Sequence, residues 1–227
     1  MSTLPQRLTE IRQRIAAAAQ RSGRSPQSVA LIAVAKTVPP ETVNEAVSAG
    51  QALFGENRVQ EAKLKMPQVS GRARWHFIGH LQSNKVRDAV ELFEMIQSVD
   101  SPSLAQEISK RAQQAGKQMP ILLEVNVASE ATKFGFTPDA ALAAVPEINK
   151  LPNIELHGLM CIPPPVKDTN DVRPYLRKLV ALKKKIETTH GIPLQHLSMG
   201  MSHDYEVAIE EGATMVRVGT AIFGARN

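Results

Sequence analysis

The sequence of 227 residues contains one cysteine, one tryptophan, two tyrosines and six phenylalanines. The lone cysteine, Cys161, allows no internal disulfide and is typical of a reducing compartment. No apolar run approaches the roughly twenty residues that a membrane-spanning helix needs, and the N-terminal residues lack the apolar core of a signal peptide. We therefore expect a cytoplasmic protein without a membrane partner. So few aromatic rings offer little surface for stacking on bases, which argues against nucleic acid as a partner.

The abundant residue types indicate an ordinary globular protein. Hydrophobic residues make up 43% of the chain and charged residues 22%. This length suits one barrel or one doubly wound sheet, and no linker or low-complexity tract divides the chain, so we expect a single domain over residues 1–227. The formal net charge of +5 favours anionic ligands, including phosphorylated small molecules.

Strand-like and helix-like segments alternate along the whole chain. Apolar runs predict strands at residues 30–37, 52–54, 75–79, 95–99, 121–127, 157–162, 195–199 and 214–218. Cap residues followed by proline, as at Ser101-Pro102 and Thr137-Pro138, begin two of the intervening helices. An amphipathic helix carrying Leu4 and Leu8 precedes the first strand. This alternation with short connections predicts a parallel (β/α)8 barrel with an extra N-terminal helix.

The predicted first strand ends on Lys36, and Pro39-Pro40 turns the chain out of the strand directly afterwards. Six apolar residues precede this lysine, which places its amine in or beside an apolar pocket. Such surroundings favour the neutral, nucleophilic amine that forms Schiff bases with aldehydes. The alternative is an ordinary strand-end lysine that reaches solvent.

In a barrel of this type the functional groups lie in loops at the carboxyl ends of the strands. The loops after strands seven and eight are its usual phosphate site, and small residues there let backbone N–H groups approach a phosphate. Each such turn alone is ordinary turn chemistry. Two of them together with a buried lysine predict pyridoxal 5′-phosphate (PLP), whose aldehyde condenses with an amine. The polar residues at these loop positions are Lys36, Asn57, His80, the segment 126–133, Ser198, Gly200, Arg217, Gly219 and Thr220.

Several motifs resemble those of the pyridoxal phosphate homeostasis protein family. They are Ala35–Thr37, Gly55–Glu61, His76–Lys85, Ser198–Asp204 and Val216–Gly224, in the order of the family. The most specific are the stretches 78–85 and 198–204. The family in turn resembles the N-terminal barrel of alanine racemase and of eukaryotic ornithine decarboxylase. The resemblance therefore implies a fold type III PLP-binding barrel, here without the second β domain.

The resemblance also implies a role for individual residues. PLP would be held as an internal aldimine on Lys36. The residues that would hold the phosphate are Ser198, Gly200, Gly219 and Thr220. Arg217 would face the pyridine nitrogen, and the ring pocket would be lined by Asn57, Ile78, His80 and Met199. We expect no catalytic residue, and the histidines show no metal-ligand spacing.

Arg217 bears on the chemistry that the cofactor would support. A guanidinium stays protonated, so a pyridine nitrogen beside it is left unprotonated and the ring becomes a poor electron sink. The alternative is an arginine that pairs with a carboxylate at the barrel rim. Relatives that racemise or decarboxylate amino acids complete their sites with a second domain, whereas this sequence ends at Asn227, and Tyr175 and Tyr205 fall in predicted helices.

We therefore expect a PLP-binding protein that maintains the intracellular supply of the cofactor, without firm catalytic activity. Its partners would be PLP and, transiently, PLP-dependent apoenzymes, and it would be a monomer or weak dimer. Three other functions stay open at this point. They are a PLP-dependent racemase or isomerase of the alanine racemase type, a cofactor-free aldolase that uses Lys36, and an interaction protein that uses the basic segment 173–185. Lys133 is either a second amine at the mouth or a surface lysine, and Cys161 is either a core residue or a reactive thiol.

Overall fold

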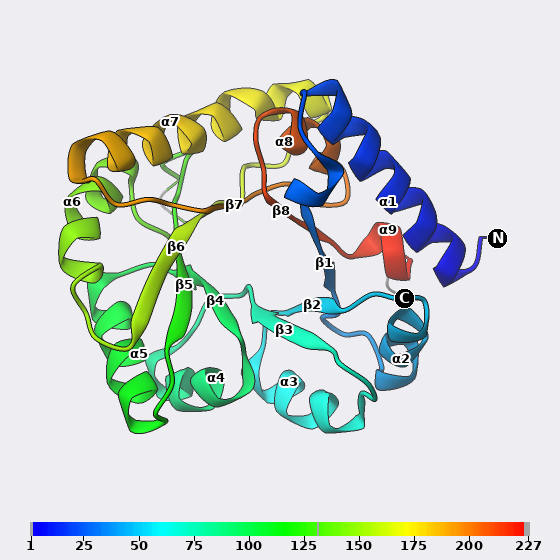
Figure 1. Cartoon of the computed structure of the whole chain (residues 1–227), viewed down its shortest axis with the longest axis horizontal. Coiled ribbons are helices and arrows are strands. Elements are labelled where there is room, and N and C mark those ends of the chain that lie inside the picture. The colour runs from blue at the N-terminus through cyan, green and yellow to red at the C-terminus, as the bar shows by residue number, and fades with distance from the viewer. Residues whose placement is uncertain (1, 131, 225–227) are drawn as a thin grey trace.

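The computed structural model describes residues 2–130 and 132–224. Its strands are all parallel, pair in chain order and close into one barrel, because β8 pairs with β1. Figure 1 shows these strands at the centre of the molecule with the helices around them. The predicted (β/α)8 barrel is confirmed. The strands are β1 (Ala30–Val34), β2 (Leu53–Glu56), β3 (Arg74–Phe77), β4 (Met95–Val99), β5 (Met119–Glu124), β6 (Ile154–Met160), β7 (His196–Ser198) and β8 (Met215–Val218).

The helices include the predicted extra one at the N-terminus. This helix, α1, buries Leu4, Leu8, Ile11 and Ile15 and lies beside α8 and α9 (Figure 1). In the described part of the chain, no helix is long and apolar enough to cross a bilayer. The helices are α1 (Leu4–Arg21), α2 (Pro40–Ser48), α3 (Val59–Lys65), α4 (Val86–Leu92), α5 (Pro102–Gln114), α6 (Pro138–Ile148), α7 (Arg173–His190), α8 (Tyr205–Glu210) and α9 (Thr220–Phe223).

The barrel interior changes from apolar to polar along the strands. Its apolar floor consists of Ile32, Leu53, Met95, Leu122, Met160 and Met215. Because side chains alternate between the two faces of a strand, the residue two places further on points to the same side. On β4, β5 and β8 those residues are Gln97, Glu124 and Arg217, which are all buried. The barrel therefore carries a buried polar layer just below the carboxyl ends of its strands.

Element ends differ from the predictions at several places. β2 extends to Glu56, although the sequence places a polar turn from residue 55, because Glu56 finds a buried partner in Lys65. β5 ends at Glu124 rather than Val127, where the chain leaves the barrel for a loop. α8 starts at Tyr205 rather than near Ser202, because the residues before it form a turn. In that turn the N–H of Met201 donates to Asp204 Oδ1 at 2.6 Å.

Candidate functional site

Lys36 lies just beyond β1 at the carboxyl end of the barrel, and its side chain is half buried. β1 pairs with β8 so that Ala33 lies beside Val218. This pairing brings Lys36 next to the loop after β8, and with Gly219 and Thr220 it lines a small cavity of about 30 Å³. Lys36, which follows the first strand, therefore lies beside the loop at Gly219 and Thr220, where the sequence predicts a phosphate site.

A buried ion pair supports the backbone directly before Lys36. Lys65 is 7% exposed and Glu56 is fully buried. The Lys65 ammonium donates to the Glu56 carboxylate and, at 2.6 Å, to the carbonyl oxygen of Ala35. Burial raises the pKa of Glu56, and the neighbouring Lys65 opposes that rise. The other oxygen of this carboxylate, Oε2, has no hydrogen-bond partner within the described residues, so the Glu56 charge depends on Lys65.

Ser202 lies at the predicted phosphate loop. Its hydroxyl accepts hydrogen bonds from the N–H of Gly219 at 3.2 Å and the N–H of Ala221 at 3.4 Å. Backbone N–H donors beside a serine hydroxyl form a donor set that suits a phosphate. The sequence predicts this role for Ser198, whereas the structure brings the hydroxyl of Ser202 to the loop. A signal was present, because both serines belong to the same motif, Ser198–Asp204.

Four buried side chains form a hydrogen-bonded chain across the barrel interior. Arg217 Nη1 donates to Ser198 Oγ at 2.7 Å, and Ser198 Oγ donates to Gln97 Oε1 at 2.7 Å. Gln97 Nε2 then lies 2.8 Å from His76 Nδ1. The guanidinium can only donate to Ser198, while the Gln97 amide accepts through its oxygen and donates through its nitrogen, so His76 Nδ1 is the acceptor.

In this hydrogen-bonded series Ser198 contacts Arg217 and Gln97, whereas the sequence predicts that it holds the phosphate. The Ser198 hydroxyl is fully buried, accepts from Arg217 and donates to Gln97. Arg217 is 4% exposed and also donates through Nη2 to the carbonyl oxygen of Cys161 at 2.8 Å. No ion pair joins it to a carboxylate of the described residues, so the alternative of a rim ion pair is wrong. Burial lowers the pKa of Arg217.

We expect His76 to make the protein sensitive to acid. Burial lowers the pKa of His76 to about 4, so the unfolded chain, with an ordinary histidine pKa near 6.5, binds a proton that the folded chain does not. Stability should therefore fall as the pH drops from about 6.5 to about 4, by up to about 3 kcal/mol. Glu124, whose pKa burial raises to about 7, contributes with the opposite sign. Urea unfolding of a His76→Gln variant and the parent across this range isolates the histidine, and identical slopes would refute this account.

Three predicted ring-pocket residues lie together at the loops after β2 and β3. These loops touch at Gly79, where an added Cβ would lie 2.3 Å from the Asn57 carbonyl oxygen, so only glycine fits. The contact places Asn57 near His80, and both line a cavity of about 380 Å³. Ile78 lies over Gly55, where a Cβ would meet its side chain at 2.9 Å.

Two other predicted cofactor residues serve packing. The Met199 side chain is fully buried in the apolar layer between barrel and helices. Gly200 has a φ of +93°, and a Cβ on it would lie 2.6 Å from the Cβ of Ala208 in α8. Neither residue lines the cavities that contain Lys36 or His80.

The rim joins loops from three successive strands. The His80 ring stacks on Phe134, with 3.6 Å between ring centroids and 10° between the planes. At the edge of the same ring, His80 Nδ1 lies 3.1 Å from Asp100 Oδ2. The loops after β3, β4 and β5 therefore contact one another at one edge of the mouth.

The loop after β5 is tied to its own first residue. Asn126 Nδ2 donates to the carbonyl oxygen of Glu130 at 2.8 Å, and its Oδ1 accepts from the Glu130 N–H at 3.2 Å. Lys133 Nζ is enclosed by the chain and lies 2.9 Å from Glu130 Oε1 as an ion pair. The Lys133 amine therefore belongs to the mouth and not to the outer surface.

Cys161 is a core residue. It is fully buried, and burial raises the pKa of its thiol to about 12, so the thiolate is absent at neutral pH. The alternative of a reactive thiol is wrong.

The basic segment of α7 is partly neutralised by α8. Arg173 forms ion pairs with Glu210 at 2.6 Å and Glu211 at 2.8 Å, and Arg177 pairs with Glu211 at 2.8 Å. These contacts fasten two neighbouring helices to each other. They argue against a docking role for the two arginines.

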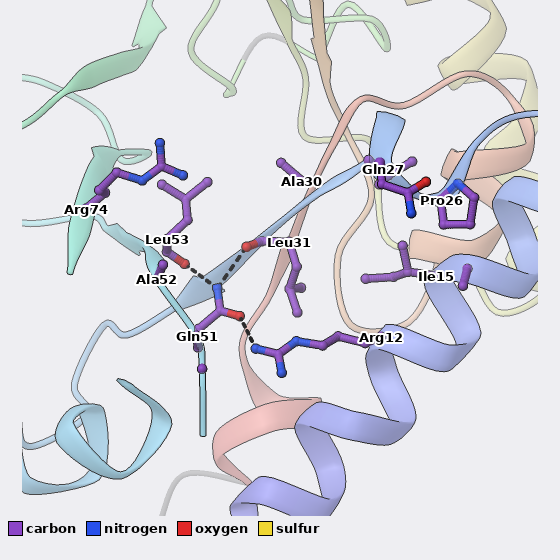
Figure 2. A pocket seen from close by; sticks show the side chains of 13 residues that line it. Arg12, Ile15, Pro26, Gln27, Ala30, Leu31, Gln51, Ala52, Leu53 and Arg74 are labelled. Carbon is purple, nitrogen blue, oxygen red and sulfur yellow. Dashed lines mark hydrogen bonds between the residues drawn. The ribbon is translucent and has the colours of Figure 1, made fainter. Parts of the chain in front are cut away.

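A cavity of about 430 Å³ lies at the opposite end of the barrel, where β1 and β2 begin (Figure 2). Gln51, which is 4% exposed, donates to the carbonyl oxygens of Leu31 at 2.9 Å and Leu53 at 2.6 Å. Arg12 of α1 donates to Gln51 Oε1 at 3.3 Å. These bonds join α1 to two strands, and no residue predicted to bind the cofactor lines the cavity.

Comparisons with known proteins agree with this geometry. The family model for the alanine racemase N-terminal domain matches residues 7–227. A pyridoxal phosphate homeostasis protein of Aquifex aeolicus is 45% identical over 222 residues, which cover 97% of each chain. The structure of PipY from Synechococcus elongatus with PLP bound is 36% identical, with a TM-score of 0.86 over 98% of this chain and 100% of PipY. An alanine racemase of Clostridium difficile shares the barrel fold, with 16% identity and a TM-score of 0.68 over 94% of this chain and 55% of its own. The chain therefore belongs to the pyridoxal phosphate homeostasis protein family.

Proposed function

We propose that this protein binds PLP on Lys36 in the cytoplasm and takes part in holding and supplying that cofactor. The observation that carries the proposal is the cavity shared by Lys36 and the Gly219–Thr220 loop. An amine and a phosphate-binding loop side by side match the aldehyde and the phosphate of PLP. The name of the Aquifex relative and the PLP in the PipY structure support the same conclusion.

The donor set of the mouth suits each part of the cofactor. Lys36 supplies the amine for a Schiff base, and the phosphate would be held by the loop N–H groups and the hydroxyls of Ser202 and Thr220. Arg217 would face the pyridine nitrogen, while Asn57, Ile78 and His80 flank the ring. The cofactor itself supplies an electrophilic carbonyl joined to an aromatic ring.

The residues around Arg217 favour a carrier over a catalyst. Ser198 and the Cys161 carbonyl hold the guanidinium in place. A fixed cation keeps a facing ring nitrogen unprotonated, which weakens the electron withdrawal that catalysis on amino acids needs. We propose that PLP-dependent apoenzymes are transient partners, and that the protein acts as a monomer or weak dimer.

The first test is the visible absorption spectrum of the purified protein after addition of PLP. We expect a band of covalently bound PLP in the parent and its loss in Lys36→Ala, because Lys36 supplies the amine in the cavity that it shares with Gly219 and Thr220. Borohydride should fix one PLP per parent chain and none per variant chain.

The matched control is Lys150→Ala, which removes an exposed lysine of the α6 region that pairs with Glu147. It should retain the full band. A parent that stays colourless with PLP would overturn the proposal and favour the cofactor-free aldolase. A band that persists in Lys36→Ala would overturn the assignment of the lysine.

A further inference from the structure

A separate cavity opens across the mouth from Lys36, between the loops that follow β5 and β6. In the closed barrel these strands lie opposite β1 (Figure 1). Its volume of about 170 Å³ is below the roughly 300–1,000 Å³ typical of sites for drug-sized ligands. None of the residues predicted to bind PLP lines it. The cavity therefore suits a separate, small molecule.

A buried carboxyl group faces this cavity. Glu124, the last residue of β5, is 8% exposed and points to the same side of the strand as Leu122 of the barrel interior. No hydrogen bond or ion pair to its carboxyl is made by the residues that the structure describes. The charged groups that influence it are Arg217, which favours its ionised form, and Asp100, which opposes it. Because the carboxyl lines the cavity and no side chain of the described residues pairs with it, a ligand in the cavity could donate to it.

A cation lines the same cavity. Lys133 lines the cavity, and its enclosed Nζ pairs with Glu130 at 2.9 Å without a hydrogen bond from the described residues. Its N–H donors would turn from Glu130 to a ligand carboxylate that enters the cavity. The rest of the wall includes the apolar side chains of Phe134 and Ile162. Both are unusually exposed for large apolar residues, at 55% and 39%. The cavity thus combines a carboxyl, an amine and an apolar wall.

We propose that this cavity binds a free α-amino acid with a small apolar side chain. The ammonium group of the ligand would donate to Glu124, and its carboxylate would accept from Lys133. Its side chain would lie against Phe134 and Ile162. The proposal does not require PLP, because every residue that carries it lies outside the predicted cofactor site.

The charges favour a zwitterion over singly charged ligands. A simple carboxylic acid would satisfy Lys133 but place a second negative charge near Glu124 and leave that carboxyl unpaired. A simple amine would satisfy Glu124 but leave the Lys133 donors unused and close to a like charge. An α-amino acid offers each group its opposite charge, and charge-assisted hydrogen bonds are the stronger kind.

The test is titration calorimetry of the full chain with L-valine, both loaded with PLP and freed of it. We expect L-valine to bind to both forms. Valinamide lacks the carboxylate and N-acetylvaline lacks the ammonium, so each should bind at least about tenfold more weakly. Glu124→Gln and Lys133→Met should each weaken L-valine binding by about tenfold, because each removes one charged partner.

The control variants are Glu147→Gln and Lys150→Met, which make the same two substitutions at an ion pair whose side chains are both exposed. They should bind L-valine as the parent does. Equal binding of valine and both analogues would overturn the proposal, as would an unchanged affinity in Glu124→Gln. Binding confined to the PLP-loaded form and insensitive to both cavity variants would also overturn it, since the amine would then be reacting with the cofactor.

The affinity should also depend on pH through Glu124. Burial raises the pKa of this carboxyl to about 7, Arg217 opposes that rise and Asp100 adds to it. Lys133, which pairs with Glu130, lines the same cavity. Only the ionised form can take an ammonium group, so binding should strengthen by up to about tenfold from pH 6 to pH 8. Glu124→Gln should remove this dependence. A parent with the same affinity at both pH values would contradict the role of Glu124.

Discussion

The free energy of unfolding of a Lys65→Met variant is expected to be about 3–5 kcal/mol lower than that of the parent. Methionine keeps the length of the side chain but removes the charge that compensates the fully buried Glu56. The variant also removes one of the two donors to the Ala35 carbonyl, one residue before Lys36, and leaves only the Val38 N–H at 3.0 Å. Urea unfolding at neutral pH measures the first effect, and the absorbance of bound PLP at limiting cofactor concentration measures the second.

Two further variants make this expectation specific. Lys63→Met removes a lysine of the same helix whose side chain is 60% exposed and pairs with Asp88 at 3.2 Å; its effect should stay within about 0.5 kcal/mol. Adding Glu56→Gln to Lys65→Met removes the stranded charge and should recover part of the lost stability. Equal losses of unfolding free energy in Lys63→Met and Lys65→Met would show that the buried pair stabilises the fold no more than an exposed pair.

A Gln97→Leu variant is expected to weaken PLP binding by about tenfold, or about 1.4 kcal/mol. Leucine cannot accept from Ser198 or donate to His76. The Ser198 hydroxyl, which accepts from Arg217, therefore loses its hydrogen-bond acceptor. Each buried group left without a partner should cost about 1–3 kcal/mol of stability in addition. Fluorescence or absorbance titration with PLP measures the affinity, and urea unfolding measures the stability.

The control for this variant is Gln113→Leu, at an exposed position near the end of α5. It should change neither quantity by more than the error of the measurement. A Gln97→Leu protein that is destabilised but binds PLP as tightly as the parent would show that the network supports the barrel and not Arg217.

The architecture and the neighbourhood of Lys36 could be predicted because they follow from topology. Once strands and helices alternate in a parallel barrel, the carboxyl ends of all strands meet at one face. The first strand then pairs with the last, which brings Lys36 to Gly219 without any knowledge of side-chain contacts. Asn57 and His80 are brought together by the same rule.

The assignments within the mouth could not be predicted, because they depend on which face of a strand each residue occupies. Ser198 and Ser202 belong to one motif and have the same chemistry. Only the register of β7 turns Ser198 inward to Gln97 and leaves Ser202 at the Gly219 loop. Gln97 lies in the strand predicted at residues 95–99, but the sequence does not show that its side chain faces the barrel interior.

The buried pair of Glu56 and Lys65 was missed for a related reason. Charged residues at the end of a short apolar run predict a turn, and a sequence does not reveal that two opposite charges nine residues apart will be buried together. The carboxyl of Glu124 was missed because strand five reads as continuous through Val127. In the structure the strand ends at Glu124, which places this side chain at the mouth.

The pairing of β1 with β8 has a consequence for how the protein acquires its ligand. Lys36 is synthesised well before Arg217, Gly219 and Thr220, with which its strand later pairs. A nascent chain therefore carries the amine long before it has the loop that would hold a phosphate beside it. Contacts between such distant segments carry a loop-closure cost that slows their formation. We therefore expect a newly made chain to bind its first PLP only after β1 and β8 have paired.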